Sequence, residues 1–361
     1  MRKSLINIGT NYVHVMGTKT ALENGAELKA AYVAGAAMTP NGNAKSSTNR
    51  VTVIVSPGDY EFTSEFAIDT PFVDVVSLTG NADVVILGAF TINVSANNVF
   101  VKGIDVLALE FKVGSNLPLT TLENCKGGDY SFAGGGIASG TFNYCTGGYG
   151  SFGGEGTASG TFDNCKGGIY SFAGGGIVSG TFNYCTGGYG SFGGDGTASG
   201  TFTNCTGGES SFGGGGGGAS GTFNNCIGGY GSFGGYYGTA SGTFNYCIGE
   251  YFSFAGGGEA SGTFNNCIGG HGSFGGEGTA SGDFYNCKGG NYSFGGGGTA
   301  SGTFNNCIGG EFSFGGSSGG VLAATVRLKY CKLTVGTFTT VTAGGKTRYC
   351  LDGNDDANNQ G

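Results

Sequence analysis

The sequence has no tryptophan, four prolines and two histidines, and these shortages exclude several classes of protein. Collagen is excluded because its triple helix needs abundant proline and glycine at every third position. A nucleic-acid partner is not expected, because such proteins carry a basic face whereas this chain has a formal charge of −8. Membrane insertion is not expected either, because no apolar run approaches the length of a transmembrane helix. The N-terminus also lacks the apolar stretch of a secretory signal, so we expect no such signal.

Glycine, in contrast, accounts for 82 of the 361 residues, and the aromatic share is 13%. So much glycine disfavours helices, because each glycine inside a helix costs about 1 kcal/mol relative to alanine. A disordered glycine-rich chain would lack the aromatic content, because such chains cannot bury enough apolar surface to offset the entropy of ordering. The composition therefore predicts a folded chain in which some repeated constraint requires glycine.

The cysteines show an internal repeat. Around each of ten cysteines the sequence approximates Ser-Phe-x-Gly-Gly-…-Ser-Gly-Thr-Phe-x-Asn-Cys-x-Gly-Gly. The successive spacings are 20 or 21 residues, which is typical of a solenoid. The ten are Cys125, Cys145, Cys165, Cys185, Cys205, Cys226, Cys247, Cys267, Cys287 and Cys307.

The residue types in the repeat predict which solenoid forms. Each unit has two short β-prone pieces, Ser-Phe and Gly-Thr-Phe-x-Asn-Cys, separated by glycine pairs that can turn with positive φ. Stacked coils would bury their phenylalanines in two columns, which a single coil cannot do. We therefore predict an all-β fold, a right-handed parallel β-helix with about 20 residues per coil and a short N-terminal capping helix. One column would contain Phe142, Phe162, Phe182, Phe202, Phe223, Phe244, Phe264, Phe284 and Phe304, and the other Phe132, Phe152, Phe172, Phe192, Phe212, Phe233, Phe254, Phe274, Phe294 and Phe314.

Four regions follow from the pattern. Residues 1–50 form an N-terminal segment with the capping helix, which we expect over residues 20–38 with Leu28 and Tyr32 on one face. Residues 51–124 form irregular β-helix coils, and residues 125–320 form the glycine-rich coils. Residues 321–361 break the period and form irregular C-terminal coils, a cap and a polar tail.

The flanking segments carry a family resemblance. A helix, then the strand Val51-Thr-Val-Ile-Val-Ser-Pro-Gly-Asp-Tyr60, then coils such as Asn98-Val-Phe-Val-Lys-Gly-Ile-Asp-Val106 resemble the pectate-lyase-like right-handed parallel β-helix superfamily. The resemblance covers residues 20–124 by pattern and 125–340 by repeat. The superfamily includes polysaccharide lyases, polygalacturonases and bacteriophage tailspikes, and it implies that the helix caps the open N-terminal end of the coil. The repeats are most similar to those of non-enzymatic tail-fibre and tailspike proteins.

The cysteine column has three interpretations. Neighbouring in-register Cα atoms would lie within disulfide range, but parallel Cβ vectors fit a disulfide poorly. Zinc needs clustered ligands, and the chain has only His14 and His271 as histidines. We favour a column of buried reduced thiols, with disulfides as the alternative.

The sequence shows no catalytic constellation. The resemblance implies that a lyase would use acidic calcium ligands and an arginine base, and that a polygalacturonase would use an aspartate cluster. No arginine lies between Arg50 and Arg327, so the long repeat region has no candidate base. We therefore predict that the protein is not an enzyme and needs no cofactor or metal.

The most variable positions of the repeat are the fourth and fifth residues after each cysteine. Most of these pairs contain a tyrosine, phenylalanine or histidine, and variable positions in a fixed scaffold are expected to be exposed. Aromatic rings on a rigid edge suit sugar faces or a protein partner. The alternative is that they are turn residues that shield the edge of the solenoid. The predicted ligand-binding residues are Tyr149, Tyr189, Tyr230, Tyr251 and His271.

These observations favour a structural or adhesive fibre. We expect a bacteriophage tail fibre or spike, located in the virion or outside the cell, that recognises a host-surface glycan or protein receptor. Other virion or fibre subunits are expected partners, and the chain is expected to form a homo-oligomer, with a trimer as one option.

Two alternatives remain. One is a β-helix polysaccharide lyase or hydrolase. The other is an ice-binding protein or another cell-surface adhesin, because a threonine column should face outward and is interrupted by Asp283. The column contains Thr141, Thr161, Thr181, Thr201, Thr222, Thr243, Thr263 and Thr303.

Overall fold

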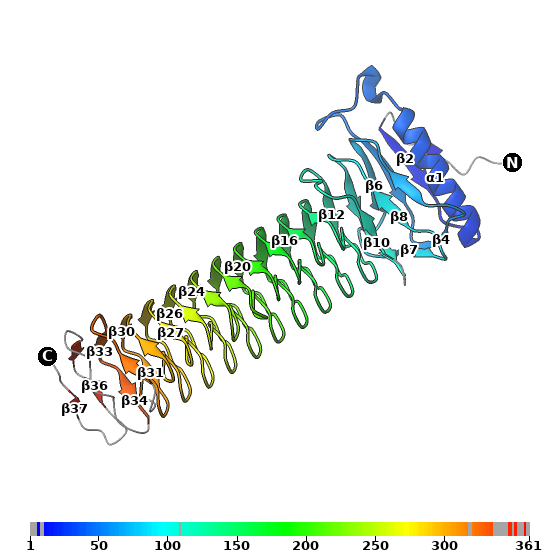
Figure 1. Cartoon of the computed structure of the whole chain (residues 1–361). Coiled ribbons are helices and arrows are strands. Elements are labelled where there is room, and N and C mark those ends of the chain that lie inside the picture. The colour runs from blue at the N-terminus through cyan, green and yellow to red at the C-terminus, as the bar shows by residue number, and fades with distance from the viewer. Residues whose placement is uncertain are drawn as a thin grey trace. The chain divides into compact units, whose positions relative to one another are not determined.

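The computed structural model describes residues 6–7, 11–107, 110–316, 320–334, 346–348, 350–351 and 357–358. The chain divides into two compact units, residues 1–168 and 169–361, so the division falls inside the glycine-rich repeat (Figure 1). The fold is a nearly all-β parallel solenoid with turns of roughly 20 residues and one short N-terminal helix, which confirms the predicted fold class. Much of the predicted polar tail lies outside the described residues.

The helix α1 (Ala21–Ala37) lies within one residue of its predicted bounds at either end. Thr20 and Glu23 form a capping box, in which each side chain bonds to the backbone N–H of the other residue. Leu28 and Tyr32 are buried, as predicted, and α1 packs against the first strands of the unit. Gly25 allows this approach, because a β-carbon built there would lie 1.9 Å from the carbonyl oxygen of Glu61.

The first unit contains three parallel ladders of short strands and a two-strand pairing. The first ladder runs β2, β3, β6, β9, β12, β14 and β16, with β1 antiparallel to β2. The second runs β4, β7 and β10, the third runs β5, β8 and β11, and β13 pairs with β15. The strands are β1 (Ile6–Asn7), β2 (Tyr12–Val15), β3 (Val51–Val55), β4 (Gly58–Glu61), β5 (Phe66–Ile68), β6 (Val73–Ser77), β7 (Val84–Leu87), β8 (Ile92–Val94), β9 (Phe100–Lys102), β10 (Ile104–Val106), β11 (Lys112–Val113), β12 (Thr121–Glu123), β13 (Ile137–Ala138), β14 (Thr141–Asn143), β15 (Thr157–Ala158) and β16 (Thr161–Asp163), and a 3-10 helix, η1, covers Pro40–Gly42.

The second unit contains two long parallel ladders and a short third one. One ladder runs β18, β20, β22, β24, β26, β28, β30, β33 and β35, and the other runs β17, β19, β21, β23, β25, β27, β29 and β32. The third runs β31, β34 and β36, with β37 antiparallel to β36. The strands are β17 (Ile177–Val178), β18 (Thr181–Asn183), β19 (Thr197–Ala198), β20 (Thr201–Thr203), β21 (Gly218–Ala219), β22 (Thr222–Asn224), β23 (Thr239–Ala240), β24 (Thr243–Asn245), β25 (Glu259–Ala260), β26 (Thr263–Asn265), β27 (Thr279–Ala280), β28 (Asp283–Tyr285), β29 (Thr299–Ala300), β30 (Thr303–Asn305), β31 (Ile308–Gly309), β32 (Val321–Leu322), β33 (Arg327–Lys329), β34 (Lys332–Leu333), β35 (Lys346–Arg348), β36 (Cys350–Leu351) and β37 (Ala357–Asn358).

Two interlocked columns of phenylalanine form the core of the repeat, as predicted. Phe202 and Phe223 stack with ring centroids 4.8 Å apart and planes 1° apart. Phe212 and Phe233 stack in the second column with the same separation and angle. Between the columns, Phe212 meets Phe223 edge to face at 5.8 Å and 87°. Each ring therefore has stacked and edge-to-face neighbours, both of which are favourable aromatic geometries.

The prediction that Ser-Phe forms a strand is wrong. The serine and phenylalanine lie in a turn, and Phe233 has the left-handed φ of 54°. Its backbone still bonds to the preceding coil, because Phe233 N–H donates to Ser211 O at 3.1 Å. The second ladder forms instead from the x-Ala pairs, such as Thr239–Ala240. A left-handed phenylalanine is costly in isolation, and here the buried ring and the inter-coil bond hold it in place.

The cysteine column consists of buried thiols that form no disulfide among the described residues, as we favoured from the sequence. Cys247 Sγ donates to Phe223 O at 3.3 Å, and Cys267 Sγ donates to Phe244 O at the same distance. Burial raises the pKa of the Cys125 and Cys145 thiols, so these groups remain protonated donors at neutral pH.

We predict that Phe223→Ala lowers stability by about 3–5 kcal/mol, because it leaves a cavity between four neighbouring rings. Nearest-neighbour coupling in a solenoid should spread the effect to adjacent coils. Hydrogen exchange across residues 200–250, together with chemical denaturation, measures both. The control is Ile248→Ala at an exposed position, which should change stability by less than about 0.5 kcal/mol. Equal effects of the two changes would contradict the buried-column structure.

Thiol counting tests the cysteine column. We expect close to twelve reactive thiols in the unfolded, non-reduced protein, because the chain has 12 cysteines and none is bridged. A dye that reacts with thiols under denaturing conditions gives the count. Recovery of few thiols until reductant is added would show that the column is oxidised into disulfides.

Candidate functional site: an exposed aromatic edge

In each unit, the candidate site is the edge formed by the fourth and fifth residues after each repeat cysteine. We call these the first and second edge positions. The first edge positions are Asp129, Tyr149, Ile169, Tyr189, Glu209, Tyr230, Tyr251, His271, Asn291 and Glu311. The second edge positions are Tyr130, Gly150, Tyr170, Gly190, Ser210, Gly231, Phe252, Gly272, Tyr292 and Phe312.

The second edge position has a local rule that explains its glycines. A β-carbon built on Gly190 would lie 2.6 Å from the ring of Tyr170, and one on Gly272 would lie 2.5 Å from the ring of Phe252. In the first unit, Tyr130 covers Gly150 in the same way, at 2.9 Å. An aromatic ring from one coil therefore lies over the bare backbone of the next coil, and a side chain there would meet the ring. Tyr292 is the exception, because the next coil has Phe312 at this position.

The covering rings also touch the first edge position of the next coil. Tyr170 meets Tyr189 at 5.5 Å and 86°, and Tyr130 meets Tyr149 at 5.4 Å and 68°. Phe252 meets His271 at 5.6 Å and 73°. The edge thus contains ring pairs in which the second-position ring covers the backbone of the next coil and contacts its first-position ring.

The five predicted ligand-binding residues all lie on this edge and differ in exposure. Tyr149, in the first unit, is 39% exposed. In the second unit, Tyr189 and Tyr230 are each 42% exposed, Tyr251 is 60% exposed and His271 is half-buried. The alternative interpretation was that these residues shield the edge of the solenoid. It fits the second edge position better than the first.

The second unit brings several of these rings together. Tyr251 lies 6.1 Å from His271, and Tyr230 connects to the same group through Phe252 at 5.8 Å. His271 also approaches Tyr292 at 5.3 Å, and Tyr292 approaches Phe312 at 5.0 Å. Tyr189 is separated from this cluster by the coil that carries Glu209 and Ser210, neither of which is aromatic.

Two neighbouring tyrosines were missed from the sequence. Tyr237 is 79% exposed, and Tyr236 contacts both Tyr237 at 4.5 Å and Phe252 at 5.1 Å. The Tyr236 hydroxyl donates to Glu277, and this bond raises the pKa of Tyr236 to about 12. The signal was available, because the 21-residue spacing from Cys226 to Cys247 shows that this coil has one extra residue.

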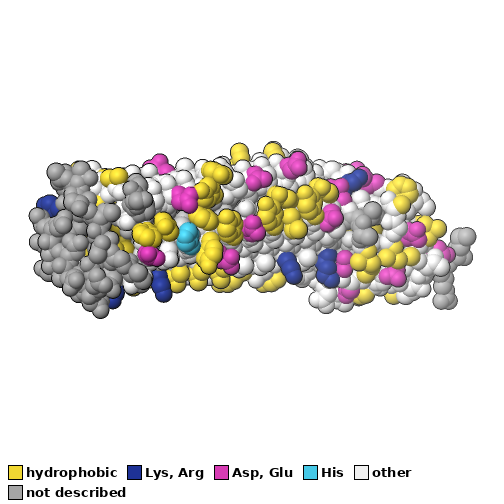
Figure 2. Space-filling model, turned by 60° about the horizontal axis from the view of Figure 1, so that its bottom comes forward, with side chains coloured by type: hydrophobic (Ala, Val, Ile, Leu, Met, Phe, Trp, Pro, Cys, Tyr) yellow, Lys and Arg dark blue, Asp and Glu magenta, His cyan; other side chains and the backbone are white. Residues whose placement is uncertain are grey.

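Carboxylates lie among the exposed rings. Glu209, Glu250 and Glu277 are exposed, and Glu311 is half-buried. Figure 2 shows patches of hydrophobic side chains with acidic side chains between them on one face of the protein. Aromatic faces next to carboxylates can stack on the CH face of a sugar ring while accepting hydrogen bonds from its hydroxyls.

The outward threonine column is also observed. Its members are half-buried or exposed on the strands that carry the inward phenylalanines, and Asp283 interrupts it. Asparagines lie two residues further along several strands, and Asn245 Nδ2 donates to Asn224 Oδ1 at 2.8 Å. The array is regular, but it is a Thr-x-Asn array and lacks the double threonine rank that we regard as the stronger signal for ice binding.

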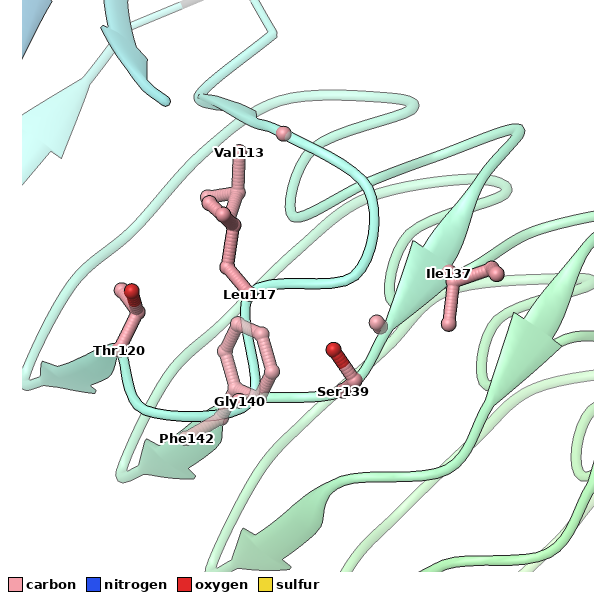
Figure 3. A pocket seen from close by; sticks show the side chains of 9 residues that line it. Val113, Leu117, Thr120, Ile137, Ser139, Gly140 and Phe142 are labelled. Carbon is pink, nitrogen blue, oxygen red and sulfur yellow. The ribbon is translucent and has the colours of Figure 1, made fainter. Parts of the chain in front are cut away.

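Three of the cavities among the described residues lie in the first unit. One in the first unit is lined by apolar groups from Val113, Leu117, Ile137 and Phe142 and has no room for a water molecule (Figure 3). Two open depressions in that unit are lined by residues including Lys126 and by residues including Lys29.

The guanidinium of Arg50 has a structural role. Arg50 is bound to Asp74, with Nε 2.7 Å from Oδ2, and to Asn98 O at 2.7 Å, so it ties successive coils together. Among the described residues, no group of three His, Cys, Asp or Glu side chains could hold a metal ion. The described part of the chain also has no helix long and apolar enough to cross a membrane.

Comparison with protein-family models, curated proteins and solved structures found no match to this chain. The class of protein is therefore defined by its fold and its edge, as a β-solenoid with exposed aromatic rings. The resemblance to the pectate-lyase-like superfamily rests on the sequence pattern alone.

We predict that Ser139→Ala stabilises the first unit by about 1 kcal/mol. The Ser139 hydroxyl is buried beside the closed cavity and has no hydrogen-bond partner among the described residues, so its removal relieves a desolvation penalty. Ser199→Ala is the matched control, because Ser199 Oγ donates to Val178 O at 3.3 Å and its loss should not stabilise. Denaturant titration compares the two variants, and stabilisation by Ser199→Ala but not Ser139→Ala would contradict the assignment.

Proposed function

We propose that the protein is a structural, adhesive fibre whose aromatic edge recognises a glycan or protein receptor on a host surface. The observation that carries the proposal is the series of partly exposed rings, Tyr230, Tyr251, His271 and Tyr237, with carboxylates beside them. These groups are held on a solenoid in which every ring has a fixed backbone position.

A rigid edge favours binding by many weak contacts. Side chains on stacked coils recur about every 5 Å, so rings one or two coils apart are about 5–10 Å apart. Successive sugars of a glycan have a comparable spacing. Because the solenoid is already ordered, little conformational entropy is lost on binding, and several modest contacts can add together.

The biological setting that we propose is a bacteriophage tail fibre or spike, in the virion or outside the cell. The support is the similarity of the coil pattern to tailspike-type repeat proteins. Such a fibre would bind other virion or fibre subunits and would form a homo-oligomer, for which a trimer is one arrangement. The function does not require nucleic acid, membrane insertion, a cofactor or catalysis.

Two alternatives are distinguished by simple assays. A polysaccharide lyase or hydrolase would release reducing ends or unsaturated products from a polysaccharide, which an adhesive fibre would not. An ice-binding protein would produce thermal hysteresis through the threonine column, and changes on the aromatic edge would leave that activity unaltered.

We predict that replacing Tyr149, Tyr189, Tyr230, Tyr251 and His271 together with serine removes binding while the fold persists. Each ring contributes modestly, so single changes should weaken binding only a few-fold, whereas the combined loss of avidity should be about 100-fold or more. Binding to an array of bacterial surface glycans, and adsorption to cells that bind the unaltered protein, measure the effect.

The matched control changes three exposed tyrosines away from the edge. Tyr144→Asn, Tyr184→Asn and Tyr246→Asn insert the residue that other coils have before cysteine, and asparagine tolerates the left-handed φ of these positions. This control should bind as the unaltered protein does. Full binding by the folded edge variant would overturn the proposal and direct attention to residues 321–361.

A further inference from the structure

One coil of the second unit breaks the rule that a ring covers each edge glycine. The second edge position that precedes Gly231 is Ser210, where the equivalent coils have Tyr170 before Gly190 and Phe252 before Gly272. A β-carbon built on Gly231 meets no atom within 4 Å, whereas the β-carbons at Gly190 and Gly272 would collide with the covering rings. The space above Gly231 is therefore open where the repeat elsewhere holds an aromatic ring.

Glycine backbone also lies beside this open position. The same coil contains the glycine run 213–218, and a β-carbon at Gly214 would lie 2.3 Å from Gly231 O and 2.7 Å from Ser210 Cα. Bare backbone thus adjoins both Ser210 and Gly231. Gly216, in the same run, also has open space around its α-carbon.

Tyr230 is the aromatic residue at the first edge position directly before Gly231. It is 42% exposed, and among the described rings it contacts Phe252 of the following coil. Tyr189 and His271 are each contacted by a covering ring from the preceding coil, whereas Tyr230 has Ser210 there instead. A ring-sized ligand above Gly231 would contact Tyr230 in the way that the Tyr170 ring contacts Tyr189.

The polar groups at this position indicate the chemistry of the ligand. Glu209 is exposed and directly precedes Ser210, so the coil before Gly231 carries a carboxylate and a hydroxyl at its two edge positions. A pyranose ring can place its CH face on Tyr230 and donate hydroxyl hydrogens to the Glu209 carboxylate. A phenylalanine side chain from a protein partner would use the stacking surface but would leave the carboxylate without a donor, and a tyrosine would offer a single hydroxyl where a pyranose offers several.

We propose that the open position above Gly231, with Tyr230, Glu209 and Ser210, binds one pyranose ring of a glycan. This inference rests on the proposed function and names the ligand class of one subsite on the edge. A single ring buries little surface, so we expect a dissociation constant on the order of 1 mM for a monosaccharide.

The test uses the full-length protein and saturation-transfer NMR. The probes are methyl β-glucopyranoside, methyl β-galactopyranoside and methyl N-acetyl-β-glucosaminide, with p-cresol as a probe for a tyrosine side chain. The main variant is Ser210→Tyr, which supplies the covering ring that the repeat has at Tyr170. The ring should fill the open position without harming the fold, and it should weaken pyranoside binding about 10-fold or more.

Three further variants make the result specific. Ser220→Tyr adds a tyrosine at an exposed site of the same coil and should leave binding unchanged. Tyr230→Ala removes the stacking surface and should weaken binding even if Ser210→Tyr fails to fold. The double change Ile169→Glu and Tyr170→Ser recreates the open position above Gly190 and should raise the binding stoichiometry from one to two.

The outcomes separate the subsite from the edge. Pyranoside binding that is lost in Ser210→Tyr and Tyr230→Ala, and doubled in the recreated site, supports the proposal. Binding of p-cresol without any pyranoside overturns it in favour of an aromatic side chain from a protein partner. If Ser210→Tyr leaves pyranoside binding unaffected, the ligand does not bind above Gly231 and this inference is overturned. The proposed function then survives only if the five-residue edge variant loses pyranoside binding. The absence of a saturation-transfer signal from every probe, at a probe concentration 10-fold above ~1 mM, also overturns the inference.

Discussion

The register of the stacked phenylalanines is the constraint on which the rest of the repeat depends. When Phe202 pairs with Phe223 and Phe223 with Phe244, every other position of the coil is also aligned with its equivalent. A slip of one residue would turn the rings outward and the polar neighbours inward. Alignment also places thiols such as those of Cys247 and Cys267 next to a phenylalanine carbonyl of the preceding coil, so these thiols serve as small buried donors.

The same alignment produces the edge. Because coils stack directly, a side chain at the second edge position lies over the backbone of the next coil, and the rings of Tyr130, Tyr170 and Phe252 each cover a glycine there. Tyr292 departs from this alternation, because the next coil has Phe312 and the two rings meet at 5.0 Å. The first edge position is freer because most of its side chains are exposed. Packing and recognition thus occupy adjacent residues on one surface.

The sequence was sufficient to predict the solenoid, the helix and both phenylalanine columns, because the period of the cysteines places identical residues above one another. The left-handed conformation of Phe233 could not be predicted, since phenylalanine has no local preference for it and only the stacked coil holds it. The identity of the second ladder was missed because alanine has low β-propensity and a two-residue strand such as Thr239–Ala240 is too short to show an alternating pattern. The edge positions were visible as variable pairs, but the covering of Gly190 by Tyr170 depends on neighbouring coils and appears only in three dimensions.

The central claim is that two phenylalanine columns interlock and hold the coils in register, and a double-mutant cycle tests it most directly. Phe212→Leu and Phe223→Leu, made singly and together, should show a coupling free energy of about 0.5–1.5 kcal/mol, because the two rings meet edge to face. The pair Phe212 and Phe284, several coils apart, should be additive within about 0.3–0.5 kcal/mol. Additive effects for Phe212 and Phe223 would contradict the interlocked core.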